Sequence, residues 1–118
     1  MNQFKLDFQV RDYECDLQGI VNNAVYLQYL EHARHEFLKS KGVNFSELHQ
    51  QGYDLVVVRS EVDYHFPLRS GNLFEVHLSV QQKGRLRLVF NQQIFRSDGR
   101  KILSALIIGT CINSQGKP

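Results

Sequence analysis

Asp16 is a residue that could do chemistry, because it stands just before a predicted helix start in the stretch DLQGIVNNAVYLQYL. A helix that begins near Asn23 exposes backbone N–H groups that lack intrahelical partners and carry partial positive charge. Such groups can stabilise the negative charge that develops on a carbonyl oxygen during acyl transfer. A nearby carboxylate can attack the carbonyl carbon or take a proton from water. Asp16 and Asn23 are therefore the candidate catalytic residues.

A structural role for Asp16 is the competing interpretation. Aspartate side chains in turns accept hydrogen bonds from nearby backbone N–H groups, and the residues alone leave both roles open. Asn22 or Asn23 is expected to cap the helix, and an amide side chain can also orient water or substrate. The sequence has no GxSxG nucleophile elbow, no phosphate-binding loop and no GxGxxG motif.

The histidines, cysteines and net charge indicate neither a metal site nor a nucleic-acid site. His32 and His35 lack a third ligand nearby, so they are interpreted as surface or interface residues and no metal is expected. Cys15 and Cys111 form no CxxC pair and are expected to be free thiols, as in a reducing compartment. The formal net charge of +2 is too small to indicate nucleic-acid binding.

The length of 118 residues fits one domain, 1–118. The protein is expected to be cytoplasmic, for two reasons. The stretch MNQFKLDFQV lacks the continuous apolar core of a signal peptide. The longest apolar run, ILSALIIGTCI, is about half the length needed to cross a bilayer. A chain of this size has a limited core, which self-association would extend.

Hydrophobic periodicity predicts one strand, one long helix and then four strands. Residues 4–10 alternate as a strand does. From Asn23 to Lys41 the apolar residues recur at helical spacing, and Gly42 is a plausible stop. The predicted buried stripe of this helix comprises Tyr26, Leu27, Leu30, Ala33, Phe37 and Leu38.

The four later strands are predicted in segments 53–66, 74–81, 85–94 and 101–112. SDGR is typical of a hairpin turn, and the last segment is apolar on both faces, as in a strand covered on both sides. This order predicts an α+β fold, with an antiparallel sheet of about five strands wrapped around one long central helix. In the first segment, the residues predicted to share one face are Val56, Val58, Val62, Tyr64 and Phe66.

The stretch VRDYECDLQGIVNNAVYLQYLEHAR resembles the signature of hotdog-fold acyl-CoA thioesterases of the 4-hydroxybenzoyl-CoA thioesterase type. In that family an Asp is followed three residues later by Gly, then by an apolar pair, a His or Asn, and an aromatic-rich helix. VVRSEVDYHFPLRSGNLFEV is similar to the family's second-to-third strand region, so the resemblance covers nearly the whole chain. The matching residues are, in order, Asp16, Gly19, Ile20, Val21, Asn23, Tyr26, Leu27, Tyr29 and the run Glu31–Arg34.

The resemblance implies a hotdog fold and an enzyme that hydrolyses acyl-CoA to a free acid and CoA, with no cofactor beyond the CoA of the substrate. It implies that Asp16 is the nucleophile or general base and that the backbone N–H near Asn23 polarises the thioester carbonyl. Ile20 stands where many relatives have His, and Asn23 where a sub-branch has His. The substrate-binding residues expected around them are Gly19, Val21, Asn22 and Tyr26.

The resemblance also implies a homodimer or homotetramer with a site at each subunit junction. From the small net charge and the short apolar runs, no nucleic-acid or membrane partner is expected. CoA phosphates need basic side chains near the pocket mouth, and the candidates are Lys83, Arg85 and Arg87. Two other functions stay open. A hotdog hydratase or dehydratase needs a second acid–base group, usually His, and the segment from Asp16 to Tyr26 contains none. A non-catalytic acyl- or CoA-binding module would use Asp16 only as a turn residue.

Overall fold

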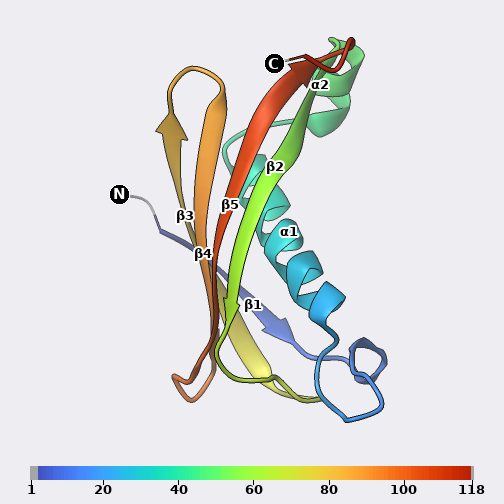
Figure 1. Ribbon diagram of the computed structural model, residues 1–118, viewed down its shortest axis with the longest axis vertical. Coiled ribbons are helices and arrows are strands. Elements are labelled where there is room, and N and C mark those ends of the chain that lie inside the picture. Colours follow the sequence, from blue (N-terminus) through green and yellow to red (C-terminus); the bar gives the residue numbers. More distant parts are fainter. Residues whose placement is uncertain (1–2, 118) are drawn as a thin grey trace.

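The computed structural model describes residues 3–117, in which a five-stranded antiparallel sheet curves around one long helix (Figure 1). The strand order across the sheet is β1-β3-β4-β5-β2. This architecture confirms the predicted α+β plan. The elements in chain order are β1 (Phe4–Gln9), a 3-10 turn (Asp12–Glu14), α1 (Asn23–Ser40), α2 (Phe45–Gln50), β2 (Tyr53–Tyr64), β3 (Leu73–Lys83), β4 (Arg87–Arg96) and β5 (Lys101–Asn113).

Helix α1 begins and ends close to the predicted positions. Asn22 is the N-cap, and its Oδ1 accepts a hydrogen bond from the Ala24 N–H at 3.0 Å, which satisfies one donor of the first turn. At the other end Gly42 has a φ of 85°, a left-handed conformation that glycine adopts without strain and that commonly terminates helices. The chain then leads into α2, which contacts β2.

One side of α1 packs on the sheet, as the helical periodicity predicted. Leu30 and Ala33 are fully buried. Leu27, predicted to be buried, is instead 43% exposed. Tyr29 is buried in the stripe because β1 covers that side of the helix, with the Phe8 and Tyr29 ring centroids 5.4 Å apart. The core therefore extends toward β1 rather than toward the Leu27 side.

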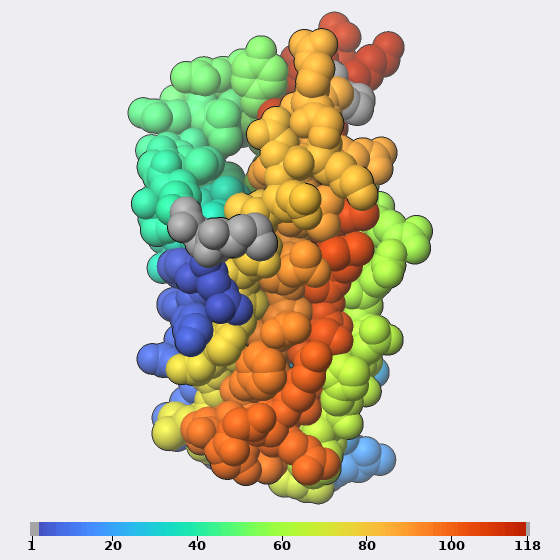
Figure 2. All heavy atoms as spheres, turned by 90° about the vertical axis from the view of Figure 1, so that its left-hand side faces the viewer, coloured from blue at the N-terminus to red at the C-terminus, as the bar shows by residue number. Residues whose placement is uncertain are grey.

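The sheet face that packs on α1 also contains one buried amide. Gln92 is 1% exposed. Its Nε2–H donates to the Leu30 carbonyl at 3.0 Å, and its Oε1 accepts from Arg34 at 3.0 Å. These bonds offset the desolvation of the amide. Figure 2 shows the opposite face of the sheet, where β3, β4, β5 and β2 lie side by side.

Strand β2 departs from the predicted alternation because its pairing with β5 shifts between Val57 and Arg59. An extra residue in a bulge moves the preceding side chains to the other face. Directly opposed residues share a face, so Val57, opposite Gly109, faces the same side as Val62, opposite Ala105, and the predicted Val56 does not. The faces expected for the first half of this strand were therefore wrong.

Two further expectations are corrected. The short helix α2 lies where no element was predicted, although Asn44 followed three residues later by Glu47 is a capping signal. The Asn44 Oδ1 accepts from the Glu47 N–H at 3.1 Å. Leu86, expected in a strand, lies in the turn between β3 and β4 and is 52% exposed. Neither helix within residues 3–117 has the length and apolarity needed to cross a membrane.

Candidate active site

Asp16 lies in a tight turn that leads into α1. The Asp16 N–H donates to the Ile20 carbonyl at 2.9 Å, and the Gly19 N–H donates to the Asp16 carbonyl at 3.0 Å. The Asp16 Oδ1 accepts from the N–H groups of Gln18 at 2.8 Å and Ile20 at 3.4 Å. Asp16 therefore has the structural role in the turn that the sequence left open. This role occupies one carboxylate oxygen, and Oδ2 has no hydrogen-bond partner within residues 3–117.

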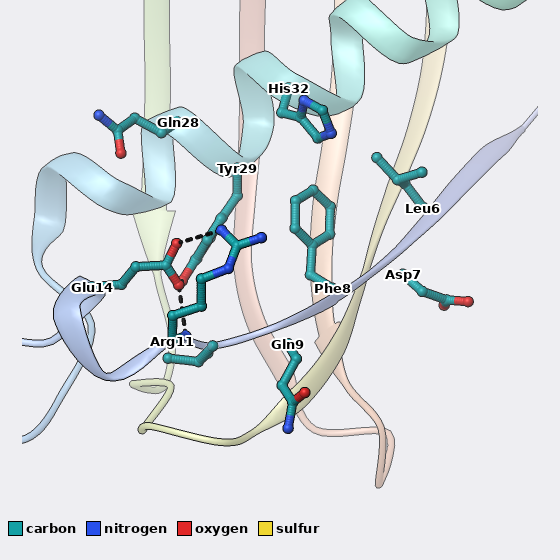
Figure 3. Close-up of a pocket in the computed structure, with 10 residues that line it drawn as sticks. Leu6, Asp7, Phe8, Gln9, Arg11, Glu14, Gln28, Tyr29 and His32 are labelled. Atoms are coloured by element: carbon teal, nitrogen blue, oxygen red, sulfur yellow. Dashed lines mark hydrogen bonds and ion pairs between the residues drawn. The ribbon is translucent and has the colours of Figure 1, made fainter.

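Glu14 ties this turn to α1 at two places. Its carbonyl accepts the Asn22 N–H at 3.0 Å, and its Oε1 accepts the Tyr29 hydroxyl at 2.8 Å. Arg11 adds a backbone N–H bond at 2.8 Å and an ion pair at 3.4 Å (Figure 3). The Glu14 side chain is only 11% exposed, so these donors compensate a largely desolvated carboxylate. The link fixes the residues before Asp16 against the helix.

Burial, together with the hydrogen bond to Glu14, raises the pKa of Tyr29 well above its ordinary value. The hydroxyl therefore keeps its proton at any pH at which the protein would work. It acts as the donor to the Glu14 carboxylate. The bond between the helix and the turn is for this reason a charge-assisted one, a stronger class than bonds between neutral groups.

A recess of about 280 Å³ opens beside the first turn of α1. The Asn23 N–H is the first of the helix and has no acceptor within the described part of the chain, as expected at this position. It is therefore available to a carbonyl oxygen bound in the recess. The lining residues are Ile20, Val21, Asn23, Tyr26, Tyr64, His65, Phe66 and Pro67.

Tyr26 forms a fixed wall of this recess. Its hydroxyl oxygen accepts the Leu68 N–H at 2.9 Å, and its ring meets that of Tyr64 edge-on with centroids 5.6 Å apart. Burial raises the pKa of the Tyr26 hydroxyl. The side chain therefore presents a protonated phenol in a rigid position.

Three of the predicted site residues, Val21, Asn23 and Tyr26, line the same recess. Asp16, Gly19 and Asn22 do not line it. Asp16 lies in the preceding turn, Gly19 shapes that turn with a φ of 79°, and Asn22 caps the helix. All six positions belong to the turn, to the start of α1 or to the segment that joins them.

The segment 64–67 lines the recess but was not predicted to belong to the site. It begins at Tyr64, the last residue of β2, and the N–H groups of His65 and Phe66 donate to the Ile102 carbonyl at 2.8 and 3.2 Å. Strand pairing between distant parts of the chain brings it there, so no local motif marks it. His65 is one of the lining residues, and its Nε2 lies 3.0 Å from the Ser104 Oγ.

The structure does not bring Lys83, Arg85 and Arg87 to this recess. They lie around the β3–β4 turn, at the end of the molecule opposite the first turn of α1 (Figure 1). Within one chain these three residues therefore do not line the recess beside Asn23.

Comparisons with known proteins find matches over nearly the whole chain. A family model described as the thioesterase-like superfamily matches residues 10–118. The acyl-acyl carrier protein thioesterase ATL3 of Arabidopsis thaliana is 37% identical over 120 residues, with 100% of this chain and 63% of that protein aligned. The chain thus spans less than two thirds of the length of this plant relative.

The acyl-CoA thioester hydrolase YbgC of Escherichia coli is 26% identical, with 96% of this chain and 86% of that protein aligned. Among solved structures, a 1,4-dihydroxy-2-naphthoyl-CoA thioesterase from Synechocystis superposes with a TM-score of 0.93 at 21% identity. That superposition covers 98% of this chain and 87% of the other. It confirms the predicted fold, a sheet wrapped around one central helix.

Proposed function

The chain belongs to the thioesterase-like superfamily, and from this premise we propose that it hydrolyses an acyl-CoA thioester to a free acid and CoA. One observation carries the proposal. The first turn of α1 offers the unpaired Asn23 N–H to a recess, and the preceding turn holds Asp16 with one carboxylate oxygen unpaired. The names of ATL3 and YbgC support thioester hydrolysis, on carrier protein and on CoA respectively.

In the proposed reaction the thioester carbonyl oxygen accepts the Asn23 N–H, which stabilises the negative charge of the tetrahedral intermediate. Asp16 Oδ2 either attacks the carbonyl carbon or takes a proton from the attacking water. Collapse of the intermediate breaks the carbon–sulfur bond and releases the CoA thiolate, which is then protonated. In the first route, water hydrolyses the resulting anhydride. The Gln18 and Ile20 N–H groups hold Oδ1 throughout.

The proposed site is completed by a second copy of the chain. Strand β2 forms one edge of the sheet (Figure 2), and Val57 and Val58 on it are 50% and 48% exposed. An unpaired edge offers N–H and C=O groups to another strand. In antiparallel pairing of two β2 edges, the start of one strand lies beside the end of the other. We therefore expect at least a homodimer.

This pairing would join two cavities. The recess lies at the end of β2, and a pocket of about 610 Å³ lies at its start, with walls that include Leu38, Leu55 and Phe90. The pocket of one copy would then adjoin the recess of the other and receive the acyl group. The same arrangement would carry the β3–β4 turn of one copy, with Lys83, Arg85 and Arg87, toward the recess of the other.

His65 is the observation that favours the alternative function, a hydratase or dehydratase. It lines the recess, whereas the segment from Asp16 to Tyr26 contains no histidine, and a hydratase or dehydratase needs a second acid–base group. The names of the relatives favour hydrolysis. Release of free thiol from an acyl-CoA separates the two chemistries, because hydration of an enoyl-CoA releases none.

The decisive experiment measures thiol release from a panel of acyl-CoAs by the wild type and by Asp16→Asn. The amide retains an Oδ1 that accepts the Gln18 and Ile20 N–H groups, so the turn and the melting temperature should be preserved. A fall in kcat on the order of a hundredfold or more is expected for loss of a nucleophile or general base, while acyl-CoA binding persists.

Asp7→Asn is the matched control, because Asp7 is exposed on β1 and outside the recess. It should leave kcat unchanged. A stable Asp16→Asn protein with near-normal hydrolysis would show that Asp16 has only a structural role in the turn and that the proposed mechanism is wrong. Acyl-CoA binding without turnover by the wild type would favour the non-catalytic module.

A further inference from the structure

The turn between β4 and β5 carries a guanidinium that is held in place without being neutralised. The Arg100 Cζ lies 3.9 Å from the centroid of the Phe66 ring, which is a stacking distance for a cation on an aromatic face. Within residues 3–117 no carboxylate forms an ion pair with Arg100. Stacking covers one face of the guanidinium and leaves its N–H edge available.

Arg96 contacts the same ring, but its charge is paired with that of Asp98. Its Cζ lies 5.4 Å from the Phe66 centroid, while its Nε and Nη2 donate to the two oxygens of Asp98 at 2.9 and 2.7 Å. This paired bond lowers the pKa of Asp98 to about 2, so the carboxylate stays ionised and bound to Arg96. Asp98 also accepts the backbone N–H of Arg100 at 3.3 Å but does not pair with its guanidinium.

Phe66 connects this uncompensated cation to the recess. Phe66 lines the recess together with Asn23 and Tyr26. The β4–β5 turn, the end of β2 and the first turn of α1 all lie at the same end of the molecule (Figure 1). A long ligand whose reacting carbonyl lies beside Asn23 can leave the recess past Phe66, the residue on which Arg100 is stacked.

We propose that Arg100 binds the phosphate at the end of the pantetheine arm of the thioester substrate. The inference rests on the proposed hydrolysis and extends it to the carrier. CoA and acyl carrier proteins both hold the acyl group on a pantetheine arm that ends in a phosphate, so one site serves either source. A planar guanidinium matches phosphate with two parallel N–H bonds, and stacking on Phe66 holds it ready to do so.

The expected effect is on binding, because Arg100 would touch the arm and not the reacting atoms. Arg100→Ala should raise KM for an acyl-CoA by roughly tenfold or more, as for loss of a hydrogen bond to a charged group, and leave kcat unchanged. The same acyl group on N-acetylcysteamine, which lacks the phosphate, should show no change in KM. Arg100→Lys should restore only part of the affinity, since an ammonium group cannot bond in parallel.

Lys101→Ala is the matched control, because it removes the same charge one residue away. It should leave both KM values unchanged. Arg85→Ala tests the rival basic turn in the same assay. If Arg100→Ala alters KM equally for both thioesters, or only Arg85→Ala raises KM for acyl-CoA, the proposal is wrong.

Calorimetric titration with phosphopantetheine and with CoA identifies the phosphate that is bound. Loss of affinity for both ligands in Arg100→Ala supports the arm phosphate. Loss for CoA alone would assign Arg100 to the nucleotide phosphates and overturn the proposal. The titration needs no turnover, so it still tests Arg100 if the wild type hydrolyses no thioester and the proposed function fails.

Discussion

Replacing Tyr29 by phenylalanine removes a single hydroxyl group from the link between α1 and the Asp16 turn. The aromatic ring remains, with its centroid contacts to Phe8 at 5.4 Å and to Phe74 at 4.8 Å. No cavity larger than the hydroxyl arises. The perturbation therefore reports on the hydrogen bond to Glu14, which measures 2.8 Å.

The cost in stability follows from the charge and burial of the acceptor. A hydrogen bond to a charged group contributes roughly 1.5–3 kcal/mol. The Glu14 carboxylate is 11% exposed and keeps the Arg11 N–H as a donor, so it is not left entirely unsatisfied. We expect Tyr29→Phe to lower the free energy of unfolding by about 2 kcal/mol, measured by urea denaturation at neutral pH.

The effect on activity distinguishes positioning from stability alone. If the link fixes the Asp16 turn relative to the Asn23 N–H, kcat should fall by roughly tenfold while KM for acyl-CoA changes little, because misplaced reacting groups lower the rate. The assay is thiol release at a temperature well below the onset of unfolding. Tyr29 would then be a positioning residue that acts through Glu14.

Tyr53→Phe is the matched control. Tyr53 is 48% exposed at the start of β2, and its hydroxyl forms no hydrogen bond within the described part of the chain. Neither stability nor kcat should change in this variant. A Tyr29→Phe protein that loses stability but retains kcat would refute the positioning argument, and one that retains both would show that the bond to Glu14 contributes nothing.

Two further predictions concern the edge of the sheet and the helix cap. Light scattering of the wild type at micromolar concentration should give the mass of at least two chains. Val58→Lys on the exposed edge should shift that mass toward the mass of one chain. A wild-type mass of one chain would contradict pairing through β2. Asn22→Ala removes the acceptor of the Ala24 N–H and should cost about 1 kcal/mol of unfolding free energy; an unchanged denaturation midpoint would show that water replaces the cap.

Periodicity located the elements whose burial depends on one regular pattern. The segment 74–81 forms β3 as predicted, and its alternating residues Phe74, Val76 and Leu78 are buried, because this strand is regular and lies inside the sheet. The same reasoning failed in the first half of β2, where the shift after Val57 changes the faces. A bulge depends on how the partner strand pairs, and that information is not contained in the spacing of one segment.

The candidate site divides in the same way. Asp16, Asn23 and Tyr26 could be predicted because the turn and the helix start are built from contacts within a short segment. His65 and Phe66 reach the recess through pairing with the start of β5, and Arg100 reaches Phe66 across the same pairing. Residues so far apart in the chain carry no joint motif, and only the folded sheet brings them together.

The buried amide of Gln92 favours one position of α1 along its axis relative to the sheet. An entirely apolar contact between a helix and a curved sheet would be nearly as favourable after a small slide along the helix axis. Gln92 bonds the Leu30 carbonyl and Arg34 together, and a satisfied polar network of this kind selects one arrangement of the core. Leu30 lies about 10 Å along the axis from Asn23. An amide far from the recess thereby determines where the first N–H of α1 lies relative to the end of β2.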